Sequence, residues 1–226
     1  MTSGHPSAEA PSRLELLLAI LTAVGHVGLE LVALRMPEGP LRQMHMYFSA
    51  AVAVPWIGYF AWRLATRPGT ASAWGLRLAG FRPAIIASAV FAAVALVPLT
   101  LVGWTSGRFP PPRTFWLVMA IYPLWGLAQQ FVLQVLVTRN LRDLVPRLPA
   151  RVLAAAALFC LAHFPNWTLM LLTLAGGIGF TWIYEKRRNL WAVGLVHGLL
   201  GATAYYLVLG EDPGAAILGA LARLTL

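Results

Sequence analysis

Long apolar runs separated by short polar segments make up most of this chain. Seven runs are long enough to be helices, and they cover residues 14–34, 45–65, 83–103, 115–137, 151–164, 168–184 and 190–209. A helix needs about 20 apolar residues to cross a bilayer, so most of these runs predict membrane spans. The apolar tail 215–226 predicts an interfacial helix or a partial eighth span. The pattern therefore predicts an all-α, polytopic membrane helix bundle with seven to eight transmembrane helices.

The composition agrees with a membrane protein. Hydrophobic residues make up 59% of the chain and charged residues 11%, whereas soluble domains carry about a quarter charged residues. The single cysteine, Cys160, excludes an intramolecular disulfide and a cysteine zinc cluster. The net charge of +9 is typical of loops held against anionic lipid. The predicted partner is therefore the lipid bilayer and not nucleic acid.

The distribution of basic residues predicts an orientation. Twelve lie on the side shared with the N-terminus: Arg13, Arg63, Arg67, Arg77, Arg82, Arg139, Arg142, Arg147, Arg151, Lys186, Arg187 and Arg188. Four lie on the opposite side: Arg35, Arg42, Arg108 and Arg113. Because cytoplasmic loops carry the excess of Lys and Arg, we expect a cytoplasmic N-terminus in a multi-pass protein of a bacterial inner membrane. We interpret residues 1–13 as a disordered cytoplasmic leader and 14–226 as a single membrane-embedded helical domain.

Few polar side chains lie inside the apolar runs, and each costs several kcal/mol if left unpaired. They are His26, Glu30, Gln129, Gln130, Gln134, His163 and His197. At about 1.5 Å per residue, the histidines with Gln129 and Gln130 lie roughly 11–18 Å from the cytoplasmic helix ends. Their convergence on one level predicts a polar cavity open toward the cytoplasmic half of the bilayer. Each residue taken alone is equally compatible with an ordinary contact between helices.

The order of these residues resembles a known family. The segment ARVLAAAALFCLAHFPN carries F-x-x-x-H as Phe159 to His163, and IYEKRRNLWAVGLVHG follows it with His197. With an E-E-x-x-x-R motif expected in the preceding span, this order resembles the CPBP family of intramembrane proteases, named for CAAX and bacteriocin processing. The similarity covers about residues 115–206.

The resemblance implies site positions. In the family a glutamate of the first motif activates water, and the histidines, with a later Asn or Asp, bind that water or polarise the scissile carbonyl. The corresponding positions here are Gln129 and Gln130 for the two glutamates, Gln134 for the arginine, His163 and His197 for the histidines, and Gly201 for the Asn or Asp. Beside these catalytic positions we expect Gln134, Phe159, Trp125 and Asn166 to contact substrate.

The glutamines change the chemistry that this motif can perform. A general base must accept a proton near the working pH, which a carboxamide cannot do. With glutamine at the positions of both acids and the arginine, no buried charge is left unpaired. We therefore interpret the three glutamines as a neutral version of the motif. The pair His26 and Glu30, at i and i+4, is the alternative source of a base. Two histidines are too few for a catalytic zinc site, which usually has three protein ligands, so no cofactor is expected.

Three functions remain open at this stage. The first is an intramembrane endopeptidase that cuts a membrane peptide or prenylated substrate with a rearranged site. The second is a pseudoprotease that binds a membrane peptide, lipid or partner helix without cutting it. The third is a non-proteolytic membrane enzyme acting on an isoprenoid lipid, although the sequence has no acidic cluster to hold magnesium and diphosphate.

Overall fold

The computed structural model describes residues 10–36 and 44–224, in which every regular element is a helix. The predicted leader therefore falls largely outside the described residues. The chain divides into two units by its internal contacts. The first unit comprises Met1–Leu76 and Val132–Thr181, and the second comprises Arg77–Phe131 and Trp182–Leu226. The single membrane-embedded domain over 14–226 stays a prediction.

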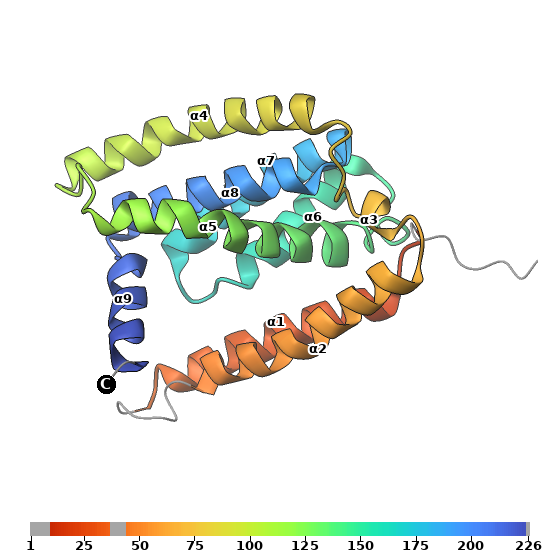
Figure 1. The fold of residues 1–226 in the computed structure, drawn as a ribbon, viewed down its shortest axis with the longest axis horizontal. Coiled ribbons are helices and arrows are strands. Elements are labelled where there is room, and N and C mark those ends of the chain that lie inside the picture. Colours follow the sequence, from red (N-terminus) through yellow and green to blue (C-terminus); the bar gives the residue numbers. More distant parts are fainter. Residues whose placement is uncertain (1–9, 37–43, 225–226) are drawn as a thin grey trace, which may run out of the picture. The chain divides into compact units, whose positions relative to one another are not determined.

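The first unit contains the N-terminal helices and the middle of the chain. Its elements are α1 (Arg13–Ala33), α2 (Met44–Thr66), α3 (Thr70–Ala73), the π-helix η2 (Val132–Thr138), α6 (Leu148–Leu161) and α7 (Trp167–Arg187) as far as Thr181. The start of α1 is fixed by Ser12, whose side chain accepts a hydrogen bond from the backbone N–H of Glu15. Helix α1 packs beside α2 (Figure 1) and against η2, which in turn contacts α6.

The second unit is built around α8 (Leu190–Ala204), which packs along α5 (Thr114–Phe131) and α4 (Phe81–Thr105). Asn189 sets the start of α8. Its side-chain oxygen accepts a hydrogen bond from the N–H of Ala192 at 3.0 Å, and its amide nitrogen donates to the carbonyl of Arg77 at 2.8 Å. One buried side chain therefore caps α8 and holds the segment that leads into α4.

Five helices of the described residues are long and apolar enough to cross a membrane. They span Arg13–Ala33, Phe81–Thr105, Thr114–Thr138, Trp167–Arg187 and Leu190–Leu209. The runs predicted at 45–65 and 151–164 are also helical, as α2 and α6, but neither is among these candidate spans. At 14 residues, α6 is about 21 Å long, well short of a hydrocarbon core of about 30 Å. The all-helical membrane class is confirmed, whereas the count of seven to eight spans is not.

The apolar tail forms α9 (Pro213–Leu224), which follows the short π-helix η3 (Tyr205–Leu209). Within the second unit, α9 runs across the direction of α4, α5 and α8 (Figure 1). The carboxylate of Asp212 accepts hydrogen bonds from Thr114 Oγ1 at 2.8 Å and Tyr206 OH at 2.7 Å. Of the two alternatives for the tail, this crossing direction and a length of 12 residues favour an interfacial helix over a span.

Candidate intramembrane site

Glycines let α5 and α8 approach closely at the point where the polar residues lie. A Cβ atom on Gly126 would come within 2.3 Å of the backbone N of Gly198, and one on Gly194 within 2.7 Å of the Cα of Leu127. Small residues are the usual means by which membrane helices bring their backbones together. Gln129 and Gln130 follow one helical turn after Gly126, and the close approach of α5 and α8 places them next to His197.

Two amide side chains bind the imidazole of His197. The Nε2 atom of Gln130 lies 3.2 Å from Nδ1 of the ring, and Oε1 of Gln129 lies 3.0 Å from Nε2. Because an amide nitrogen can only donate, Nδ1 accepts the bond from Gln130. The ring proton is then on Nε2, which donates to Gln129. The arrangement is a neutral histidine with an amide on each nitrogen, and we call Gln129, Gln130 and His197 the amide–imidazole cluster.

Gln134 lies in the first unit, on η2, and is fully buried. Its Nε2 donates to Thr181 Oγ1 at 3.1 Å. The sequence did not predict the π-helix, which replaces the last turns of the predicted helix over 115–137. It also gave no reason to select Thr181, because a single threonine in an apolar run is an ordinary residue. A π-helical turn inside a longer helix is often found at functional sites.

The remaining candidates in the first unit form local contacts. The Nδ1–H of His163 donates to the carbonyl of Phe159 at 2.7 Å, and the two rings pack edge to face with centroids 4.8 Å apart. His26 and Glu30 form the expected i, i+4 pair, with Nε2 and Oε2 3.7 Å apart and both side chains about one-third exposed. Both act electrostatically on His163. The pair is therefore near enough to influence that histidine.

Two residues expected to contact substrate have clear local positions. Asn166 caps the start of α7, where its Oδ1 accepts a hydrogen bond from the N–H of Leu169 at 3.0 Å. Trp125 is exposed on the surface of α5. Substrate contact by either residue stays a prediction.

Sequence reasoning missed a buried ionic cluster around Glu15, at the start of α1. The carboxylate accepts hydrogen bonds from Arg63 Nη1 at 2.7 Å and Asn140 Nδ2 at 3.0 Å. Tyr59 OH and Arg139 Nη2 also donate to it. Glu15 lies in the first turn of an apolar run, close to its polar end, so its position alone gave no sign of burial. The available signal was the placement of Arg63 and Arg139 on the same predicted side of the membrane.

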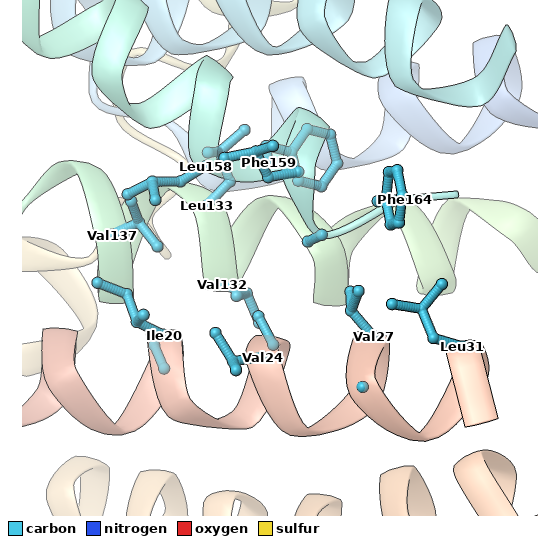
Figure 2. A pocket seen from close by; sticks show the side chains of 15 residues that line it. Ile20, Val24, Val27, Leu31, Val132, Leu133, Val137, Leu158, Phe159 and Phe164 are labelled. Atoms are coloured by element: carbon cyan, nitrogen blue, oxygen red, sulfur yellow. The ribbon is translucent and has the colours of Figure 1, made fainter. Parts of the chain in front are cut away.

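An apolar cavity of about 440 Å³ lies within the first unit, between α1, η2 and the end of α6. Figure 2 shows Ile20, Val24, Val27 and Leu31 pointing from α1 toward side chains of η2 and α6. Phe159, expected to contact substrate, lines this cavity. We call it the apolar slot.

The structure also bears on where a metal ion would be held. Within residues 10–36 and 44–224, no group of three or more His, Cys, Asp or Glu side chains is arranged to bind a metal ion. The polar groups that converge inside the second unit are instead the two amides and the imidazole of the amide–imidazole cluster.

These features define a helical membrane protein whose second unit holds two amides and one imidazole in contact. Residues 111–203 match the family model described as Type II CAAX prenyl endopeptidase Rce1-like. The match confirms the resemblance to the CPBP family over this part of the chain and, with the candidate membrane spans, supports a CAAX protease-like membrane protein. The matched region contains α5, η2, α6, α7 and most of α8. No curated protein and no solved structure matches the chain.

Proposed function

We propose that this CAAX protease-like protein binds a membrane peptide without hydrolysing it. The supporting observation is the amide–imidazole cluster, in which both nitrogens of His197 are hydrogen-bonded by Gln129 and Gln130. Hydrolysis requires a group that takes a proton from water near neutral pH. Neither amide can do so, and Nδ1 of His197, the ring nitrogen without a proton, already accepts the hydrogen bond from Gln130. Loss of a general base typically lowers the rate by about 10²–10⁴-fold.

The same cluster is suited to binding. An amide side chain offers both a donor and an acceptor, which are the two groups that a peptide backbone presents. Intramembrane polar groups of this kind provide hydrogen bonds that lipid cannot supply to an entering peptide. Amide side chains therefore retain the hydrogen-bonding capacity of a peptide site while removing its charge and its base.

Endopeptidase activity is the second candidate function. It is favoured by the pair His26 and Glu30, which lie 3.7 Å apart on α1 in the same unit as His163. In this alternative Glu30 takes the proton of water through His26. The family match over residues 111–203 includes His163 but neither residue of the pair.

A reconstitution experiment distinguishes the two functions. The purified protein is placed in phosphatidylcholine vesicles with a farnesylated CAAX peptide that carries a fluorophore and a quencher on either side of the scissile bond. We expect saturable binding and no cleavage above that of the variant His197→Ala. We expect the double variant Gln129→Ala, Gln130→Ala to bind several times more weakly. Leu124→Ala, at an exposed residue of α5 that is not a predicted site position, is the control.

Cleavage by the wild-type protein that disappears in Glu30→Gln would overturn the binding proposal and establish the endopeptidase. Absence of saturable binding of the peptide would also overturn it. The single variant Gln129→Glu should remain inactive, because a lone carboxylate there lacks the arginine that the family motif places at the position of Gln134.

A further inference from the structure

The apolar slot has a lining made entirely of apolar residues from three elements. They are Ala19, Ile20, Ala23, Val24, Val27, Gly28 and Leu31 of α1, Val132, Leu133 and Val137 of η2, and Leu158, Phe159, Leu161, Ala162 and Phe164 at the end of α6. Ile20, Val24, Val27 and Leu31 recur at helical spacing, so one continuous face of α1 forms a wall (Figure 2). A volume of about 440 Å³ is in the range of small-ligand sites.

The slot is accessible from the side of the helices and not only from within the unit. Three of its lining residues are also among the exposed large hydrophobic residues, with Val24 62%, Leu161 57% and Val132 45% exposed. Helix α1 and the segment Thr114–Thr138, which ends in η2, are both candidate membrane spans. The medium that reaches the slot is therefore bilayer hydrocarbon.

The length of the slot is comparable to that of one extended acyl chain. Its wall on α1 extends from Ala19 to Leu31, which corresponds to about 18 Å at 1.5 Å per residue. Half of a hydrocarbon core is about 15 Å. A packed interior leaves few voids larger than a water molecule, so a lipid-accessible cavity of this size is expected to be filled by a hydrocarbon chain.

Positive charge lies beyond one end of the slot. Ala19 is one helical turn from Glu15, and Val137 is two residues before Arg139, so the buried ionic cluster adjoins this end. Glu15 is bound there by two arginines, Arg63 and Arg139. Further arginines lie close in sequence to the residues of the cluster. Arg13, two residues before Glu15, is exposed, and Arg67 and Arg142, within four residues of Arg63 and Arg139, are half-buried; the exposed Asp143 follows Arg142. Since Arg13 begins a candidate span, it lies at headgroup depth, and Ala19 at the end of the slot lies about 9 Å further along α1.

We propose that the apolar slot is a lipid site that takes one acyl chain of an anionic phospholipid, with its phosphate at the end marked by Arg13, Arg67 and Arg142. The walls of the slot select a hydrocarbon chain, and the excess of arginine selects a negative headgroup. The residues of this site belong to the first unit and those of the amide–imidazole cluster to the second, and the proposal does not depend on what that cluster binds.

Photo-crosslinking of a labelled lipid tests the proposal. The protein is reconstituted in phosphatidylcholine vesicles containing a small fraction of phosphatidylglycerol with a diazirine near the end of one acyl chain. After irradiation, peptides are mapped by mass spectrometry. We expect labelling of the residues that line the deep end of the slot, around Leu31 and Phe164. The same diazirine on phosphatidylcholine should label these residues several times less.

Two glycine variants provide a matched comparison. Gly28 lines the slot, and a Cβ atom at Gly28 meets nothing within 4 Å. Gly28→Phe should therefore fill the slot without a backbone clash and lower labelling by at least about tenfold, equivalent to about 1.4 kcal/mol. Gly58 on α2 is equally open but does not line the slot, so Gly58→Phe should leave labelling unchanged. Ala162→Leu serves as a second filling variant if Gly28→Phe does not fold.

Three results would overturn the proposal. The first is labelling of the slot that is unaffected by either filling variant. The second is equal labelling by the anionic and zwitterionic probes, which would show that the charge of the headgroup does not contribute to binding at the slot. The third is displacement of the lipid by a farnesylated peptide at equimolar concentration, which would assign the slot to an isoprenoid chain.

Discussion

Among single residues, Glu15 has the largest predicted effect on stability. Its carboxylate is 4% exposed and is the counter-charge of the buried Arg63 and Arg139. Removing one partner of a buried ion pair leaves an uncompensated charge and typically costs about 3–5 kcal/mol. We therefore expect Glu15→Gln to lower the free energy of unfolding by about this amount, measured by denaturant unfolding in detergent micelles and followed by circular dichroism.

Glu30→Gln is the matched control for Glu15. The pair of Glu30 with His26 is about one-third exposed on both sides, and exposed ion pairs contribute only about 0–1 kcal/mol. Comparable destabilisation by both variants would show that the Glu15 cluster is not the structural ion pair described above.

At the same scale, the sequence located candidate polar residues but not their partners. Gln129, Gln130 and His197 were selected because polar groups are costly inside apolar runs. Which amide binds which ring nitrogen depends on the register between α5 and α8. Glycine contacts at Gly126 and Gly198 set that register, and no pattern within either helix reports it.

At the scale of elements, the contact between α5 and α8 predicts that replacing two different glycines by alanine will have different effects on stability. A Cβ on Gly126 would meet backbone atoms of α8 at 2.3–2.5 Å, whereas one on Gly201 meets nothing within 4 Å. Gly126→Ala should force the helices apart and lower the free energy of unfolding by about 1–3 kcal/mol, as overpacking usually does. Gly201→Ala should be neutral or stabilising by up to about 1 kcal/mol, because alanine favours a helix over glycine.

The two glycine variants are compared by thermal unfolding in the same detergent. Equal stability of Gly126→Ala and wild type would contradict the close approach of α5 and α8. The comparison also concerns the candidate site, because a shift of α5 would separate Gln129 and Gln130 from His197.

The attachment of α9 is predicted to depend on pH through Asp212. Burial raises the pKa of this carboxyl, but the N–H groups of Ala215 and Gly214 and the hydroxyls of Tyr206 and Thr114 lower it by more, so the pKa lies below its ordinary value of 3.8. Hydrogen bonding to the carboxylate therefore stabilises the folded state fully above pH 3.8 and is lost as the pH falls through the lowered pKa.

At neutral pH, Asp212→Asn should reproduce this loss. We expect faster hydrogen–deuterium exchange of the α9 amides than in wild type, with α4 and α8 unchanged, since exchange reports local opening. Glu211→Gln, a change at the exposed neighbouring acid, is the control. Unchanged α9 exchange in Asp212→Asn would show that the helix is held by other contacts.

Among the elements, the sequence predicted the helices well, because each apolar run must satisfy its backbone hydrogen bonds internally in lipid. It did not predict that residues 132–138 form a π-helix. The side chain of Thr138 donates to the carbonyl of Leu133 there. A π-turn costs hydrogen-bond geometry and persists only where tertiary contacts stabilise it, so the local pattern of apolar residues could not reveal it.

At the scale of the whole molecule, the excess of arginine on one side predicts the orientation in the membrane. The candidate span Thr114–Thr138 separates Ser106 from Asp143, both of which are exposed. In a Cys160→Ser background expressed in bacterial spheroplasts, we expect a membrane-impermeant maleimide to label Ser106→Cys directly. Asp143→Cys should be labelled only after permeabilisation, because Asp143 belongs to the arginine-rich side that is predicted to be cytoplasmic. The reverse pattern would show the opposite orientation.

The sequence by itself determined the class of this protein, an all-helical membrane protein of the CAAX protease-like type. Apolar length and motif order are properties of neighbouring residues, and both can be read along the chain. Only the tertiary structure decided the Glu15 cluster, the amides on His197 and the apolar slot. Arg139 and Glu15 are 124 positions apart, and their contact follows from how whole helices pack. The packing of helices determines which polar groups are buried and which are paired. The free-energy cost of an unpaired polar group is largest in these buried contacts.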